Sequence, residues 1–481
     1  MARNPVVLVH GYSDRGESFG VWKSILEKNN FPTADVHVCT YKTLTNEVTV
    51  RDIAEGFDRA LRVEAGMSAT QPFDAIVHST GMLVVRSWLT QYEGRKGRLK
   101  RLIGLAPATW GSPLAHKGRS WLGAIFKGNK DVTDPDFMEA GDAVLDALEL
   151  GSRFTWDLAH VDLLGDKVFY GPDANTPYVF ILCGIEAYGG LRSVVNEPGM
   201  DGTVRWAGTT LDTRKIALDL TRQPDGAGPR VSIIAPPLDS PRVPIAGVNH
   251  GTILSHPEAG AGLVPLVLRA LAVEDAPGFK TWQADAATTT AGARQRLRED
   301  KNLGEWQQFV VRAMDERGDP IPDYHLELMS AEDNPLREIE ALGMDVHAYR
   351  ADPSFRCFHL DVGKLRNIET GNLRVRIMAS SGSTLVAYQG FGSEKTAGGG
   401  VQPDGKWDAQ LDLSKTDAQG FKVFYPFTTT MIELRLNREP MPLDPGTAPD
   451  LCRFLTPGKA PAPVAPTVVR EDPTRLIGQA P

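Results

Sequence analysis

One stretch constrains the fold more than any other, the run Phe73-Asp-Ala-Ile-Val-His-Ser-Thr-Gly-Met-Leu-Val-Val-Arg-Ser-Trp88. Its first half is an apolar run of the length of a buried strand, and from Met82 onward the apolar residues have the spacing of a packed helix. Between the two lies Val77-His-Ser-Thr-Gly81, close to the G-x-S-x-G pattern that holds a serine in a sharp turn between strand and helix. Such a turn directs the Ser79 hydroxyl out of the sheet. It also puts the Thr80 N–H at a helix start, where negative charge is stabilised.

The turn is not a full match to the pattern. Gly81 supplies the small residue needed where helix crowds strand, but Val77 stands where glycine or alanine is usual. The pattern alone therefore leaves a plain strand-to-helix turn as the alternative.

Three further segments occur in a compatible order. They are Pro5-Val-Val-Leu-Val-His-Gly-Tyr12, Asn196-Glu-Pro-Gly-Met-Asp-Gly-Thr-Val204 and Gly247-Val-Asn-His-Gly-Thr252. With them, residues 1 to about 275 resemble the α/β-hydrolases, and within these the lipases and esterases, whose chain order is Ser, Asp, His. Ala106-Pro-Ala-Thr-Trp-Gly-Ser-Pro-Leu-Ala115 also resembles a segment that follows the next strand in bacterial lipases.

The resemblance implies a serine hydrolase that cleaves carboxylic esters of lipids through an acyl-enzyme. A serine hydroxyl is a poor nucleophile at neutral pH, so it needs an adjacent base that a carboxylate orients. The matching residues are Ser79 as nucleophile, His250 as base and Asp201 as acid. The backbone N–H groups of Tyr12 and Thr80 would form the oxyanion hole.

Alternatives exist for each of these roles. His256 competes with His250 but precedes Pro257, and Asp239 and Asp162 compete with Asp201, whose Asp-Gly pair also suits a plain turn. Ser112 is not preceded by a sharp strand-to-helix turn of this kind, so it is not expected to be the nucleophile. His10 and His78 are interpreted as structural. The same triad would serve a thioesterase, an amidase or a polyester hydrolase, and Val77 favours a non-catalytic binding module.

Strands and helices alternate along the first part of the chain. Strands are expected at Val6–Val9, Asp35–Tyr41, Leu99–Leu105 and Pro177–Ile185, in addition to the central one, and helices at Glu17–Asn29, Val50–Val63 and Leu263–Val273. This alternation predicts an α/β fold with a mostly parallel sheet and helices on both faces. Arg230–Pro236 is expected as a further short strand, followed by a proline-rich loop that leads to His250.

The length of 481 residues exceeds what one core usually supports, so two domains are expected. Residues 1–283 form the predicted catalytic domain, with an insertion at about 112–170 that is either a helical lid over the serine or a structural excursion. Residues 284–304 are rich in alanine, threonine and charge and are assigned as a linker. Residues 305–440 show spaced, alternating short strands, which predict a β-sandwich-like domain. The Pro/Ala-rich tail, 441–481, is expected to wrap loosely or to be disordered.

Composition excludes several classes of function. A net charge of −8 without a basic stripe argues against nucleic acid as a partner. The four cysteines are far apart, with no zinc-type spacing, and Cys39 and Cys183 are interpreted as buried thiols. Asp315, Asp319 and Asp323 could suggest calcium, but a solvated turn is favoured. No phosphate loop or dinucleotide fingerprint occurs, so neither a metal nor a cofactor is expected.

The expected partners are a lipid or other ester substrate, a lipid surface contacted peripherally, and a protein bound by the C-terminal β domain. The first residues run straight into a strand, with no segment typical of a signal peptide. A cytoplasmic location is therefore expected, with signal-independent export as the alternative.

Overall fold

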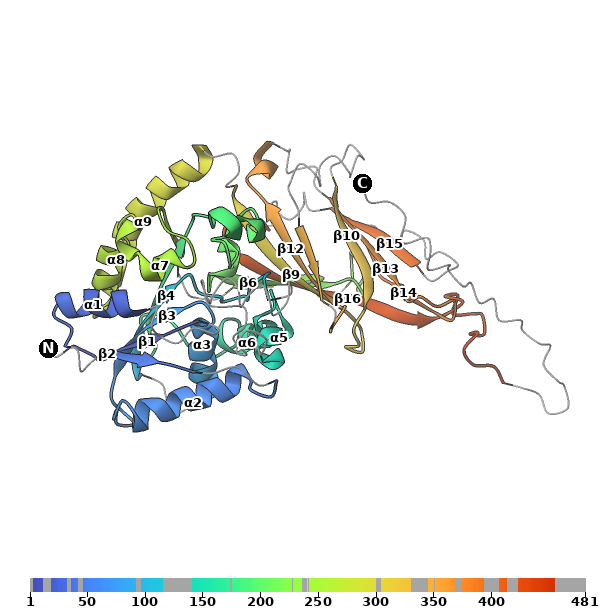
Figure 1. Ribbon diagram of the computed structural model, residues 1–481. Helices are drawn as coiled ribbons and strands as arrows, with labels where there is room; N and C mark the ends of the chain where they lie inside the picture. The colour runs from blue at the N-terminus through green and yellow to red at the C-terminus, as the bar shows by residue number, and fades with distance from the viewer. Residues whose placement is uncertain are drawn as a thin grey trace.

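The computed structural model describes residues 3–11, 19–32, 36–41, 46–91, 97–115, 141–173, 175–226, 228–235, 240, 242–299, 304–329, 345–349, 351–367, 374–392, 406–412 and 423–454. The amino-terminal part is built on a six-stranded sheet in the order β2-β1-β3-β4-β5-β8 (Figure 1). Every neighbouring pair is parallel. Its strands are β1 (Val6–Val9), β2 (Val36–Cys39), β3 (Phe73–His78), β4 (Leu99–Leu105), β5 (Tyr178–Gly184) and β8 (Arg242–Ile245).

Helices cover both faces of this sheet (Figure 1). One face packs against α2 (Val50–Val63) and α3 (Gly81–Gln91), and the other against α1 (Gly20–Lys28), α7 (Thr252–Ser255), α8 (Leu263–Ala270) and α9 (Ala276–Glu299). Strands buried on both faces need apolar side chains in both directions, which is why β1 and β3 are nearly continuous apolar runs. The predicted fold class is confirmed for this part of the chain.

The C-terminal part is a β domain, as predicted. A three-stranded sheet, β10-β13-β15, faces a larger sheet, β11-β12-β9-β16-β6-β7, in which β14 also pairs with β16. Both sheets contribute side chains to one apolar core, among them Phe309, Ile377 and Trp407. The strands are β6 (Thr213–Asp219), β7 (Val231–Ile234), β9 (Trp306–Asp315), β10 (Asp323–Met329), β11 (Asp345–Ala348), β12 (Phe355–Asp361), β13 (Arg374–Ser380), β14 (Val386–Gln389), β15 (Lys406–Asp412) and β16 (Thr429–Pro440).

Two strands of the larger sheet come from the first half of the chain. β6 pairs in parallel with β16, and β7 pairs with the other edge of β6, so both lie in a sheet of the β domain although they precede residue 283. The predicted domain boundary at residue 283 did not include this contribution of β6 and β7 to the β domain, because pairing between segments so far apart leaves no local pattern. The segment assigned as a linker is helical in its described part, because residues 284–299 belong to α9. Phe279, Trp282 and Ala286 of α9 are buried at helical spacing.

The described part of the insertion packs between the two units. It contains α5 (Asp142–Leu148) and α6 (Arg153–Asp162). The ring of Trp156 meets that of Phe355 edge-on at 5.3 Å, and Tyr349 of the β domain donates a hydrogen bond to the Leu150 carbonyl. Residues 116–140 of this insertion lie outside the described residues. The lid therefore stays a prediction.

A titratable contact joins α6 to the β domain. His160 donates from Nδ1 to the Trp156 carbonyl, and its Nε2 accepts from Lys215 at 3.0 Å. Lys215 in turn pairs with Glu433 at 2.8 Å. Burial, and after it the positive charge of Lys215, lowers the pKa of His160. If His160 were protonated, its Nε2–H would face the Lys215 ammonium group, and the two positive charges would repel each other.

This contact predicts a pH-dependent loss of stability. Because the pKa of His160 is lower in the folded than in the unfolded protein, its contribution is complete above about pH 6.5 and is lost as the pH falls below that value. The urea midpoint of the wild type should therefore fall more between pH 7.5 and pH 5 than that of His160→Gln. Parallel curves for the two proteins would contradict this.

Candidate active site

The turn after β3 holds Ser79 in a strained backbone conformation. Its φ is +52°, a left-handed value that non-glycine residues rarely adopt. A Cβ at Gly81 would lie 2.6 Å from the Val9 carbonyl oxygen, and one at Gly11 would lie 2.8 Å from the Ser79 Cβ. Only glycine fits at either place. The Ser79 carbonyl accepts a hydrogen bond from the Ala108 N–H at 3.0 Å, so the segment after β4 fastens the turn.

The two residues expected to supply the oxyanion hole differ in what the structure describes. Thr80 is fully buried and directly precedes α3, so its N–H lies at the amino end of that helix. Tyr12 lies outside the described residues. The preceding His10 donates from Nδ1 to the Gly11 carbonyl at 2.6 Å, accepts from the Tyr41 N–H at Nε2 and stacks on the Tyr41 ring. These contacts give His10 a structural role, as expected.

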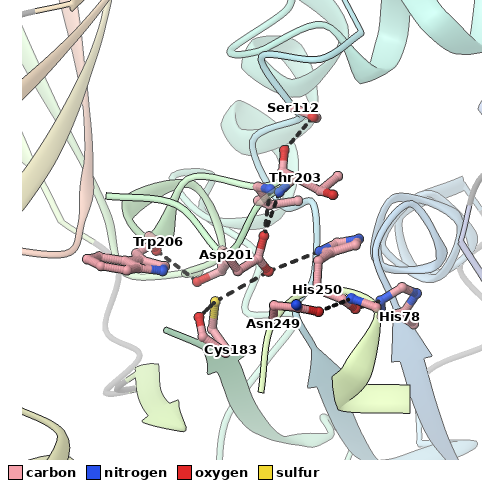
Figure 2. Close-up of polar contacts among 12 residues, drawn as sticks. His78, Ser112, Cys183, Asp201, Thr203, Trp206, Asn249 and His250 are labelled. Carbon is pink, nitrogen blue, oxygen red and sulfur yellow. Dashed lines mark hydrogen bonds and ion pairs between the residues drawn. The ribbon is translucent and has the colours of Figure 1, made fainter. Parts of the chain in front are cut away.

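Asp201 lies in a loop that its own carboxylate organises. Oδ1 accepts from the backbone N–H groups of Thr203 at 3.0 Å and Val204 at 2.8 Å. Oδ2 lies 3.0 Å from Nδ1 of His250, and both side chains are completely buried (Figure 2). The Asp201 carbonyl also accepts from the His250 N–H at 2.9 Å. Two residues 49 positions apart are therefore joined through both side chain and backbone.

His250 is held from its other side by the residue before the serine. Nε2 of His78 donates to the His250 carbonyl at 3.0 Å, and the two ring centroids lie 4.6 Å apart (Figure 2). Burial, and next the charge of His250, keeps the pKa of His78 well below its usual value, so His78 stays neutral. His250 is thus next to the turn at Ser79. Its bond to Asp201 uses Nδ1–H and leaves Nε2 as the proton acceptor.

The competing residues lie in other environments. His256 is exposed, and its Nδ1 contacts the Ser255 hydroxyl. Asp162 is buried in an ion pair with Arg86 at 2.8 Å, which makes it a structural carboxylate. Asp239 lies outside the described residues. Ser112 donates to the Thr203 carbonyl at 2.6 Å and so braces the loop of Asp201 (Figure 2).

Two residues near Asp201 were missed as parts of the site. The Cys183 sulfur lies 3.8 Å from Oδ2 of Asp201, and the Tyr188 hydroxyl contacts the Thr203 hydroxyl at 2.9 Å. Cys183 lies near the carboxyl end of β5, the edge of a parallel sheet where ligands and catalytic groups gather. That position is the signal that could have identified it.

Among the described residues, no group of three or more His, Cys, Asp or Glu side chains could hold a metal ion. Within the same residues, no helix combines the length and apolar character required to cross a bilayer. The Asp315 carboxylate accepts from the N–H groups of Arg317 and Asp319 and so caps a turn.

Searches with family models and among curated proteins gave no match. Comparison with solved structures did give matches. Phospholipase PlaB from Legionella pneumophila superposes with a TM-score of 0.73 at 24% identity, over 97% of this chain and 98% of PlaB. Its complex with thio-NAD superposes with a TM-score of 0.71 at 24% identity, over 96% and 97% of the two chains. The chain has the α/β-hydrolase fold.

The likeness to PlaB includes the β domain as well as the α/β-hydrolase sheet, since nearly the whole of both chains is matched. The mature lipase BlEst2 from Bacillus licheniformis is similar to a smaller part, with 17% identity over 56% of this chain and 92% of the lipase, at a TM-score of 0.35. In this chain, the turn of Ser79 follows β3, the loop of Asp201 follows β5, and His250 follows β8.

Proposed function

We propose that the protein is a serine hydrolase that cleaves carboxylic esters of lipids through an acyl-enzyme on Ser79. The observation that carries the proposal is the buried Asp201–His250 pair, in which the His250 carbonyl accepts from His78, the residue before the strained Ser79. A carboxylate that fixes an imidazole tautomer beside a serine is the arrangement that activates a hydroxyl nucleophile.

The reaction follows from these groups. The Ser79 oxygen attacks the ester carbonyl carbon while His250 Nε2 takes its proton, and the negative charge on the carbonyl oxygen is stabilised by the Thr80 and Tyr12 amides. The intermediate collapses, and the proton passes from His250 to the departing alcohol. Water then attacks the acyl-enzyme, giving its proton to His250, and Ser79 recovers a proton as the acid leaves. Asp201 stays ionised and stabilises the imidazolium.

Lipid esters are favoured as substrates because the structure similar over the whole chain is named a phospholipase. The alternatives are a thioester, amide or polyester substrate, which the same triad would cleave, and a non-catalytic module. Turnover of nitrophenyl esters of increasing chain length and of phospholipid vesicles separates these substrate classes.

A fluorophosphonate probe tests the nucleophile directly. The probe should label the wild type and leave Ser79→Ala unlabelled, while Ser112→Ala should label like the wild type. Labelling of Ser79→Ala, or none of the wild type, would refute the proposal. The second result would favour the binding module.

A groove with both apolar and polar walls offers a place for the acyl chain. It has a volume of about 640 Å³ and lies between β2 and α2, with walls that include Val38, Ile53, Phe57 and Leu61. Tyr41, which follows β2, also lines the groove, and its ring stacks on His10 at 4.3 Å. We propose that long acyl chains enter this groove.

Filling the groove should shorten the preferred chain. Gly56 lines it, and a Cβ added there meets no atom within 4 Å, so Gly56→Leu places its side chain in the groove without a backbone clash. We expect kcat/KM for long-chain esters to fall by roughly 10- to 100-fold, because each excluded methylene forfeits about 0.8 kcal/mol, with short esters unaffected. Gly292 of α9 also has nothing within 4 Å, so Gly292→Leu is the matched control. Equal losses for short and long esters would exclude this site.

A further inference from the structure

Arg242 is a buried cation with no ionic partner among the residues that the structure describes. It is the first residue of β8, where it pairs with Ile181 of β5, and it is 8% exposed. Among the described residues, its Nε and Nη1 have no hydrogen-bond acceptor, and no carboxylate lies within 4.0 Å of its guanidinium. Burying a charge in this way is costly unless another charge compensates it.

Aromatic rings hold the guanidinium in place. Its carbon lies 4.6 Å from the centre of the Phe427 ring and 6.0 Å from that of Trp206, distances typical of cation–π contacts. Phe427 belongs to the β domain and has a strained φ of +63°, and Trp206 follows the loop of Asp201. Both units of the molecule therefore contribute to the position of this charge.

Cys183 lies between Arg242 and the predicted catalytic acid. The charge of Arg242 acts on the Cys183 thiol. The Cys183 sulfur lies 3.3 Å from the Gly184 carbonyl oxygen and 3.8 Å from Oδ2 of Asp201 (Figure 2). Burial, and next the charge of Asp201, raises the pKa of Cys183 well above its usual value, so the thiol stays neutral. A neutral thiol can face the Arg242 cation with its sulfur while its one proton is shared between the Gly184 carbonyl and Asp201. The contacts form one chain from Arg242 through Cys183 and Asp201 to His250.

We propose that Arg242 is a positioning residue whose buried charge keeps Asp201 directed at His250, acting across the Cys183 thiol. The proposal rests on the proposed function, because it assumes that Asp201 orients the base. The other titratable or charged groups that face this chain are His78, which packs on His250, and Arg294 of α9, which repels Arg242. Neither supplies a negative charge, and Asp201 is the carboxylate whose charge acts on Arg242, across the Cys183 thiol.

The test is the pH dependence of kcat/KM for a short ester. Removing a positive charge favours protonation of the Asp201–His250 pair. In Arg242→Gln the acid limb, the part of the pH profile where kcat/KM falls at low pH, should therefore move to higher pH by on the order of one pH unit. Arg242→Lys keeps the charge and should keep the acid limb near that of the wild type. A purely structural arginine would change the folded fraction and leave the limb in place.

The thiol gives a second pair of variants in case Arg242→Gln does not fold. Cys183→Ala breaks the chain of contacts and should move the acid limb upward, whereas Cys183→Ser keeps a donor and an acceptor and should not. The downfield proton resonance of His250 Nδ1–H should titrate at correspondingly higher pH in the shifted variants.

A folded Arg242→Gln with the wild-type acid limb would overturn the inference, as would an equal shift in Arg242→Lys. If Arg242→Gln does not fold, an unshifted Cys183→Ala would overturn it. Failure of the proposed function is distinguishable, since it appears as fluorophosphonate labelling of Ser79→Ala.

Discussion

Asp201→Asn is expected to lower kcat for ester hydrolysis by roughly 10⁴-fold while leaving the fold intact. The reason lies in how the structure orients the side chain. Thr203 and Val204 both donate N–H groups to Oδ1, so the oxygen of an asparagine amide must occupy that position. Its NH₂ group is then forced toward Nδ1 of His250, at the place where Oδ2 now accepts. His250 would have to carry its proton on Nε2, the nitrogen that must accept one from Ser79.

The measurement is kcat for a short-chain nitrophenyl ester, together with the circular dichroism of each variant. Asp157→Asn is the control, because Asp157 is an exposed carboxylate paired with Arg153 on the surface of α6. It should retain the wild-type rate. A kcat of Asp201→Asn within tenfold of the wild type would exclude Asp201 as the orienting acid.

Asp162→Asn is expected to lower the free energy of unfolding by about 3–5 kcal/mol. Arg86 donates to Asp162 through Nε at 2.8 Å and Nη2 at 2.9 Å, and neither side chain is exposed. Tyr170 adds a hydrogen bond to the same carboxylate at 2.6 Å. Removing the negative charge would leave a buried guanidinium uncompensated, in the helix that begins directly after the turn of Ser79.

Urea unfolding measures this loss, and two controls separate its cause. The exposed pair of Arg153 and Asp157 should contribute less than about 1 kcal/mol in the same assay, because solvent screens it. Replacing both Arg86 and Asp162 by apolar residues should recover much of the loss, since no unpaired charge then remains. A double variant as unstable as Asp162→Asn would show that the loss comes from packing and not from the unpaired charge.

The α/β part of the fold could be predicted from local pattern. The strand at Val6–Val9, the helix at Val50–Val63 and the strand at Leu99–Leu105 lie where the sequence predicts them. Each is an apolar run or an amphipathic period of sufficient length, and a parallel sheet with two covered faces follows from their alternation. The predictions for Ser79, Asp201 and His250 came from the family resemblance, and the geometry brings Asp201 and His250 into contact.

The missed elements lacked a local signal. β8 contains Pro244 in a proline-rich stretch and was taken for loop, but it is the edge strand of its sheet, where proline is tolerated. β6 was missed because its partners, β16 and β7, follow it, one of them near the end of the described chain. The roles of Arg242 and Cys183 could not be predicted, because they depend on the loop of Asp201 and on aromatic rings that only the tertiary fold brings close to them.

The parallel strand β16 has a consequence for when the candidate site is completed. The Thr429 hydroxyl donates to the carbonyl of Ala207, just after the loop of Asp201, and these residues are 222 positions apart. At the usual pace of translation, roughly 10 to 45 s separate their synthesis on the ribosome. A nascent chain thus contains Ser79 long before β16 is available to contact the segment that follows the loop of Asp201. The contact between Thr429 and Ala207 forms only once β16 has docked, so a chain interrupted before β16 lacks it.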